Sequence, residues 1–250
     1  MKIVVLAGGL STERDVSITS GKQVFKALKE NGHSTILLDV FMGIEEEFES
    51  IESLFENGYD FTKTATGVST EIPDLQKIKA MRKDKSDSIF GQNVIDICRY
   101  ADICFLALHG GMGENGQLQA AFDMLGIRYT GAGYLGSAIA MDKGVTKAVF
   151  LQTGVPTPMS KLYKKEALTN GELENWSDFP CVVKPCSAGS SVGVSIVESK
   201  DDFEKAMIEA FRFEGKVLVE QYIKGREFSI GVLGDKALPI IEIIPKTGFY

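Results

Sequence analysis

The sequence predicts an α/β protein whose N-terminal part is a doubly wound parallel sheet. An apolar run over residues 3–7 ends in Gly8-Gly9, and an amphipathic pattern over residues 13–31 then leads to a second apolar run over residues 34–40. This strand–helix–strand order is typical of a parallel sheet with helices on both faces, in which ligands bind where strands end. After the helix-breaking residues 155–158, short β-branched runs predict a second unit of α+β structure.

Composition narrows the class of protein. With 250 residues and 44% hydrophobic side chains, the chain can form two or more packed domains. A net charge of −7 argues against a nucleic-acid or anionic-membrane partner. Since no apolar run suits a signal peptide or a membrane span, we expect a cytoplasmic protein. The four cysteines lack C-x-x-C spacing and indicate buried thiols, and two histidines, His33 and His109, offer little for a histidine metal site.

The first loop, residues 8–15, follows the first predicted strand and therefore faces a ligand site. The helix after it is expected to end at Asn31-Gly32, a plausible C-cap. Within the loop, residues 11–15 also fit an alternative interpretation, an N-cap followed by acidic residues of the first turn.

The pattern loosens over residues 41–100, where helices are expected at residues 45–55 and 74–81. We assign no chemistry to this segment. A buried strand over residues 102–108 then leads directly into His109 and a glycine-rich turn that ends at Gly116. Such a turn at the end of a core strand indicates a functional loop.

A short helix over residues 118–125 and a strand over residues 127–130 precede the run Gly131 to Gly136, which matches G-x-G-x-x-G. This motif raises the alternative of a dinucleotide site. That site needs an acidic residue about 20 positions later, where residues 152–156 contain none. We therefore interpret these glycines as a domain junction.

The next predicted helix, residues 136–152, carries Lys143 in an apolar setting. A helix lysine is usually solvated, but this one has a stem suited to burial and an ammonium that can point into a cleft.

Two predicted strands, residues 181–183 and 194–197, flank a loop that begins at Lys184. Gly189 and Gly193 allow successive backbone N–H groups to turn toward one anion, and Ser190 and Ser191 add hydroxyl donors. The loop therefore predicts a phosphate site, with an ordinary flexible hairpin as the alternative. It differs from a P-loop because a strand, not a helix, follows it.

Beyond a helix over residues 200–213, a strand over residues 217–223 contains Glu220. A carboxylate in a buried strand needs a partner. An adenine amine and a neighbouring lysine or arginine both remain open. Gly234-Asp235 between two apolar runs then predicts a hairpin of strands 228–233 and 236–244.

Together these motifs resemble the D-alanine–D-alanine ligases, a branch of the ATP-grasp enzymes. The resemblance rests on five stretches: residues 8–17 (G-G-x-S-x-E-R-x-V-S), 109–116, 141–143, 184–193 and 220–227. It implies an N-terminal substrate-binding domain over residues 1–132, a central ATP-grasp domain over 133–217, and the beginning of a C-terminal ATP-grasp domain over 218–250.

The resemblance also implies roles for individual residues. Glu13 and Ser190 would orient the amino group of the first D-alanine as catalytic residues, and His109 would lie beside that substrate. The residues expected to bind ATP are Lys143 and Lys184 at the phosphates, Ser190 and Ser191 in the loop, Glu220 at the adenine amine, Gln221 and Ile223 at the adenine edge, and Glu227 at the ribose. One departure is Asn115, where the family commonly has aspartate.

The implied activity is the ATP-driven joining of two D-alanines through an acyl phosphate, for peptidoglycan synthesis. Mg²⁺ is expected on the phosphates, with its ligands beyond Tyr250, so residues 1–250 alone are expected to be inactive; the family also suggests a homodimer. The alternatives are a ligase that joins D-alanine to D-serine or D-lactate, and a non-catalytic ATP-binding protein.

Overall fold

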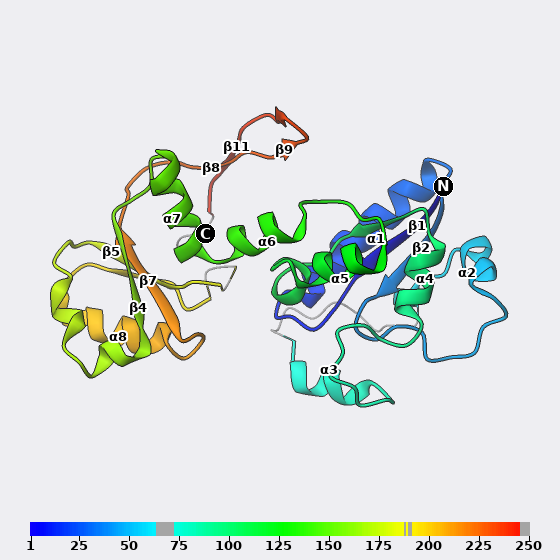
Figure 1. Cartoon of the computed structure of the whole chain (residues 1–250), viewed down its shortest axis with the longest axis horizontal. Coiled ribbons are helices and arrows are strands. Elements are labelled where there is room, and N and C mark those ends of the chain that lie inside the picture. The colour runs from blue at the N-terminus through cyan, green and yellow to red at the C-terminus, as the bar shows by residue number, and fades with distance from the viewer. Residues whose placement is uncertain (64–72, 188, 190–191, 246–250) are drawn as a thin grey trace. The chain divides into compact units, whose positions relative to one another are not determined.

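The computed structural model describes residues 1–63, 73–187, 189 and 192–245. The chain forms two compact units, Met1–Met141 and Asp142–Tyr250, and most of their helices and strands are labelled in Figure 1. The division into three domains, at residues 132/133 and 217/218, stays a prediction.

A parallel three-stranded sheet forms the centre of the first unit. Its strands are β1 (Lys2–Ala7), β2 (Ser34–Asp39) and β3 (Ile103–Leu106), in the order β2-β1-β3. Val4 pairs with Ile36 on one side and with Cys104 on the other. Both faces of the sheet are covered, which explains why β1 is an unbroken apolar run and not an alternating one.

Helices cover the two faces separately, so the doubly wound arrangement is confirmed. Helix α1 (Arg14–Glu30) packs Phe25 against Val5 and Leu37 on one face. The opposite face packs against α2 (Ile51–Asn57), α4 (Val94–Tyr100) and α5 (Gln117–Leu125).

Several predicted boundaries in this unit were wrong. Helix α2 begins at Ile51 and not at residue 45, because Ser50 caps it by accepting from Ser53 N. Helix α4 was not predicted, and the expected strand 127–130 is a single bridge between Tyr129 and Cys104. Helix α3 (Leu75–Met81) forms as predicted, and two short 3₁₀ turns, η1 (Phe61–Lys63) and η2 (Gly111–Gly113), complete the unit.

The single helix predicted over residues 136–152 is two helices, α6 (Tyr134–Met141) and α7 (Lys143–Thr153). Asp142 lies between them in an extended conformation, and its side chain accepts from Val145 N at 3.1 Å. This N-cap starts a new helix at Lys143, a local preference that outweighs the continuous apolar pattern.

An antiparallel sheet in the order β4-β7-β5-β6 forms the core of the second unit. Its strands are β4 (Ser160–Lys164), β5 (Cys181–Pro185), β6 (Ser195–Val197) and β7 (Lys216–Gln221). Pairing of β5 with β6 confirms the predicted strand–loop–strand, whereas β4 was not predicted. Helix α8 (Lys200–Ala210) packs Phe203 and Met207 onto one face of the sheet. The 3₁₀ turns η3 (Lys165–Leu168) and η4 (Glu172–Asn175) follow β4.

Two small antiparallel pairs follow β7. Strand β8 (Glu227–Ser229) pairs with β11 (Ile241–Ile243), and β9 (Val232–Leu233) pairs with β10 (Lys236–Ala237). The Gly234-Asp235 hairpin is thus confirmed, but each of the predicted strands, 228–233 and 236–244, is divided in two.

The four cysteines are free and buried, as predicted. No helix in the described part of the chain is both long and apolar enough to cross a membrane.

We expect the two helix glycines of the first unit to respond oppositely to alanine. A Cβ at Gly21 in α1 would lie 2.6 Å from Ala7 Cβ, whereas at Gly136 in α6 the nearest atom, Ala132 Cβ, is 4.0 Å away. Gly21→Ala should therefore lower the free energy of unfolding by about 1–3 kcal/mol. Gly136→Ala should raise it by about 0.5–1 kcal/mol. Urea titrations of both variants measure this, and equal effects would contradict the close packing of α1.

Candidate functional site

The second unit holds a buried carboxylate between two lysines. Lys147 Nζ donates to Glu220 Oε2 at 2.8 Å, and Lys184 Nζ donates to Glu220 Oε1. Lys147 also donates to Thr157 Oγ1 at 2.9 Å. Of the two partners left open for Glu220, the structure shows the lysine.

The alternation of side chains along β5 and β7 places this cluster on one face of the sheet. Val217 and Val219 of β7 point toward α8, so Glu220 points to the opposite face. Lys184 projects from the neighbouring strand β5, and α7 brings Lys147 over the same face. The cluster therefore depends on three elements that are far apart in the sequence.

The charges in this cluster stabilise one another. Burial raises the pKa of Glu220, but hydrogen bonds from Lys147 and Lys184, together with their charges, bring the pKa below its ordinary value. Glu220 is thus ionised at neutral pH. Its side chain is only 13% exposed, so the carboxylate is stable there chiefly because both lysines remain.

Lys143 adds a further ammonium group nearby. As the first residue of α7, it donates to the Cys186 carbonyl oxygen from its backbone N at 3.1 Å and from Nζ at 3.2 Å. Burial lowers the pKa of Lys143, and repulsion from the charge of Lys184 lowers it further. Two ammonium groups that repel each other at the start of the β5–β6 loop favour an anion between them.

The ends of the β5–β6 loop rest on the turn after α8. Glu214 accepts from Ser187 N at 2.7 Å and from Ser187 Oγ at 3.1 Å. At the other end, Gly193 has φ +69°, and a Cβ there would lie 2.7 Å from Phe213 Cδ2. Glycine is therefore required at this position. Ser190 and Ser191, predicted to bind substrate and phosphate, lie outside the described residues.

The remaining predicted nucleotide residues lie beyond Glu220. Gln221 ends β7, with its N–H bonded to Met159 O at 2.9 Å. Ile223 is 61% exposed, and Glu227 is exposed at the start of β8. Among the described residues, none of these three donates to or accepts from the side chains of Lys147, Lys184 or Glu220.

In the first unit, a network around Asp39 shapes the Gly8-Gly9 turn. Asp39 is fully buried, and its Oδ1 accepts from Gly9 N at 3.2 Å and from Phe41 N at 2.9 Å. Arg14 pairs with Asp39 and donates to Gly9 O at 2.6 Å. Gly8 has φ +72°, and a Cβ there would lie 2.6 Å from Asp39 Oδ2, so a side chain would break this packing.

Glu13 and His109 come together on facing loops. Ser11 Oγ donates to His109 O at 2.7 Å, and Glu13 N donates to Ser11 Oγ at 3.2 Å. A Cβ on Gly110 would lie 2.6 Å from Glu13 Oε2, which places the carboxylate directly over the second loop. The enclosed space between the loops is only about 10 Å³, room for a single water.

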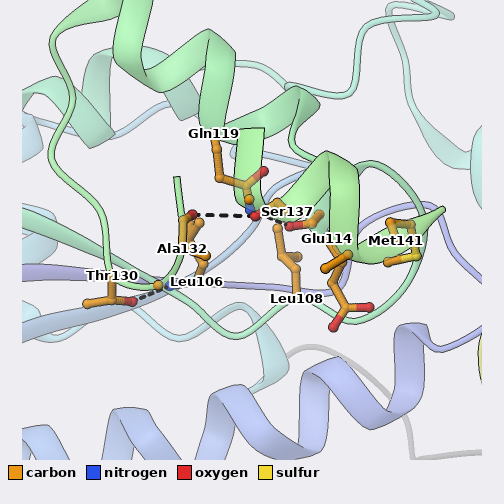
Figure 2. Close-up of a pocket in the computed structure, with 12 residues that line it drawn as sticks. Leu106, Leu108, Glu114, Gln119, Thr130, Ala132, Ser137 and Met141 are labelled. Atoms are coloured by element: carbon orange, nitrogen blue, oxygen red, sulfur yellow. Dashed lines mark hydrogen bonds between the residues drawn. The ribbon is translucent and has the colours of Figure 1, made fainter. Parts of the chain in front are cut away.

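A larger cavity of about 400 Å³ lies beside the same glycine-rich turn (Figure 2). It is lined by Leu106 of β3, by Glu114 and Gln119, and by Ser137 and Met141 of α6. Gln119 Nε2 donates to Gly113 O at 2.8 Å, while Gln119 Oε1 is buried without a partner among the described residues. None of the predicted site residues lines this cavity, although the Gly131–Gly136 run borders it.

Several residues of these networks were given no role from the sequence alone. Lys147 follows Lys143 by four residues and thus shares its helix face, a signal that was available. Asp39 ends β2 beside the Gly8-Gly9 turn, where parallel strands place their ligand-side residues. Thr157 and Glu214 gave no such signal, since only the tertiary structure brings them to the cluster.

Among the described residues, no group of three or more His, Cys, Asp or Glu side chains could hold a metal ion. We therefore assign no magnesium ligands among these residues.

Removal of the Glu220 charge should destabilise the second unit strongly. Glu220→Gln leaves Lys147 and Lys184 without their shared anion and should lower the free energy of unfolding by about 3 kcal/mol. Glu209→Gln, which breaks an exposed pair with Arg212, should change it by less than about 0.5 kcal/mol. Urea titrations at pH 7 measure both, and similar losses would contradict the role of the cluster.

The same contribution should depend on pH. Since the folded-state pKa of Glu220 lies below the ordinary 4.5, its stabilisation is fully present above that value and is lost as the pH falls through the lowered pKa. The difference in unfolding free energy between wild type and Glu220→Gln should therefore be constant near pH 6–7. It should shrink toward roughly pH 3, where carboxylates become protonated. A difference that grows on acidification would rule this out.

Comparison with known proteins matches both units to one family. The family model described as "D-ala D-ala ligase N-terminus" matches residues 2–132, and the one described as "D-ala D-ala ligase C-terminus" matches residues 149–250. The D-alanine--D-alanine ligase of Lacticaseibacillus casei (strain BL23) is 43% identical over 250 residues, which are 100% of this chain and 69% of that protein. The enzyme of the same name from Pediococcus pentosaceus is 42% identical over 252 residues, with 100% and 70% covered.

Solved structures give the same answer. The D-alanine--D-alanine ligase of Bacillus anthracis complexed with ATP superposes with a TM-score of 0.68 at 29% identity, covering 100% of this chain and 68% of that one. The ligase from Coxiella burnetii gives a TM-score of 0.68 at 28% identity, covering 98% and 71%. The fold is therefore that of the ATP-grasp ligases, and the chain belongs to the D-alanine–D-alanine ligase family.

Proposed function

We propose that this chain binds ATP in its second unit and D-alanine in its first, as a ligase that joins two D-alanines for peptidoglycan synthesis. The observation that carries the proposal is the group of Lys143, Lys184 and Glu220 at the start of the β5–β6 loop. A relative with the same fold is complexed with ATP.

The nucleotide would bind along the exposed side of this group. Lys143 and Lys184 would hold phosphate oxygens, and an arriving anion would relieve the repulsion between their ammonium groups. Glu220 keeps acceptor sites beyond those used by Lys147 and Lys184, and would also accept from the adenine amine at the end of β7. Gln221 and Ile223 would lie along the base and Glu227 at the ribose. Ser190 and Ser191 would donate to phosphate from the loop.

The first D-alanine would bind on the open side of the Glu13 and His109 loops, because the enclosed space there holds only a water. The Glu13 carboxylate suits the ammonium group of the amino acid. Helix α1 fixes Glu13 at its N-terminus, and the Arg14–Asp39 pair fixes the turn before it. Ser190 would complete this site.

The reaction would proceed in two steps. A carboxylate oxygen of the first D-alanine attacks the γ-phosphorus of ATP, which releases ADP and forms an acyl phosphate. The amine of the second D-alanine then attacks the acyl carbon, a proton is lost, and phosphate leaves as the amide forms. The lysines would neutralise the transferring charge and the loop would exclude water. Mg²⁺ on the phosphates would supply further charge.

The oligomeric state and the cellular location belong to the same proposal. We infer a homodimer in the cytoplasm from the family resemblance.

Calorimetric titration with ATP tests the nucleotide half. Lys143→Ala and Lys184→Ala should each raise the dissociation constant by about 10- to 100-fold, the effect of one charge-assisted hydrogen bond. Lys205→Ala, in an exposed pair with Asp202, should leave it unchanged. NAD serves as a control ligand for the alternative based on the Gly131–Gly136 run. Unchanged ATP affinity in both variants, with folding verified by circular dichroism, would refute the proposed phosphate site.

Titration with D-alanine tests the other half. Glu13→Gln removes the charge that pairs with the ammonium group and should weaken binding by roughly 10-fold or more. Asp15→Asn, in the first turn of the same helix, is the matched control and should bind as wild type does. If both variants bind D-alanine normally, Glu13 does not receive the amino group.

A further inference from the structure

The ring of His109 contacts a serine of helix α1 that no motif singled out. Ser20 Oγ lies 3.2 Å from His109 Nε2, within hydrogen-bond distance. Ser11 Oγ meanwhile donates to the His109 carbonyl oxygen at 2.7 Å. His109 is therefore held at its main chain and at its ring by serines of one continuous segment.

The packing of α1 sets the distance between Ser20 and the ring. Ser17, one turn earlier, is fully buried and donates from Oγ to Ala107 O at 2.7 Å. Gly21 lets the helix backbone approach Ala7 and Ala107, since a Cβ there would lie 2.6 Å from Ala7 Cβ and 3.8 Å from Ala107 Cβ. Residues three and four apart share a helix face. Because the contacts of Ser17 and Gly21 fix α1 against the sheet, Ser20 lies within hydrogen-bond distance of His109.

A serine hydroxyl can donate to a bare Nε2 or accept from Nε2–H, so the direction of this hydrogen bond sets which ring nitrogen can donate. When the imidazole is neutral and Ser20 donates to Nε2, the ring proton is on Nδ1. When the ring is charged, Nε2–H donates to Ser20 and Nδ1–H is still a donor. Among the described residues no hydrogen bond reaches Nδ1, so this N–H is available to a ligand.

We propose that Ser20 is a positioning residue that donates to Nε2 of His109, which fixes the orientation of the ring, keeps the proton of the neutral ring on Nδ1, and presents Nδ1–H to the carboxylate of the bound amino acid. The inference rests on the proposed function, in which Glu13 takes the ammonium group of that amino acid. A donor on the neighbouring loop then suits the other charged end of the same small molecule.

Nitrogen-15 NMR of the imidazole rings tests this directly, because the chain has only two histidines, and His33 serves as an internal reference. In Ser20→Ala, the His109 ring signals should move toward those of tautomers in exchange, while those of His33 stay fixed. Thr19→Ala, which removes the neighbouring hydroxyl bonded to Asp15 O, should leave both rings unchanged. Ser20→Thr keeps a hydroxyl and should restore the wild-type signals. Alanine is the better helix former, so the variant should fold.

D-alanine should shift the His109 signals of the wild type, and Ser20→Ala should raise its dissociation constant roughly fivefold, the effect of one hydrogen bond. His109 ring signals that are identical in Ser20→Ala and wild type would overturn the proposal. If Ser20→Ala alters the ring but D-alanine shifts no wild-type signal, Ser20 holds His109 and the proposed function fails instead.

Discussion

The ion cluster at Glu220 is the interaction on which the second unit depends. One carboxylate accepts from Lys147 of α7 and from Lys184 of β5, so a helix and two strands are joined by a single charged group. Burial of any one of these charges alone would be costly, and each is stable only while its partners stay in place. The same constraint holds Lys184 at the start of the β5–β6 loop, where burial and then the charge of Lys184 lower the pKa of Lys143. The stability of the unit and the proposed binding of phosphate therefore depend on the same side chains.

The first unit also contains a buried carboxylate that is neutralised, at the Gly8-Gly9 turn. Asp39 is fully buried and accepts from the backbone of the Gly8-Gly9 turn while it pairs with Arg14. Because Arg14 follows Glu13 directly, the pair that stabilises the turn also fixes the N-terminus of the helix that carries the proposed ammonium ligand. Serines then connect this segment to the His109 loop. In both units, residues that satisfy buried polar groups hold the residues proposed to bind ligand.

Much of this could be predicted from the sequence. The unbroken apolar β1 and the amphipathic α1 predicted the doubly wound sheet, and the β-branched runs around Lys184 predicted the β5–β6 pair. Predictions failed where a local signal competed with periodicity. Asp142 caps a new helix within a continuous apolar pattern, and Ser50 delays the start of α2. Strand β4 was missed because Lys161 and Lys164 interrupt its apolar residues and its pairing with β7 is a long-range contact.

The sequence by itself determined the family, the order of the elements and the residue types proposed to meet phosphate and an amino group, because these follow from local patterns and short motifs. Only the tertiary structure showed that Glu220 pairs with lysines, since this depends on which strands lie side by side. It likewise decided that Ser20 meets His109, because the approach of α1 to the sheet depends on packing at Gly21. Contacts between residues distant in the chain are set by how the apolar faces pack, and periodicity alone does not specify that packing.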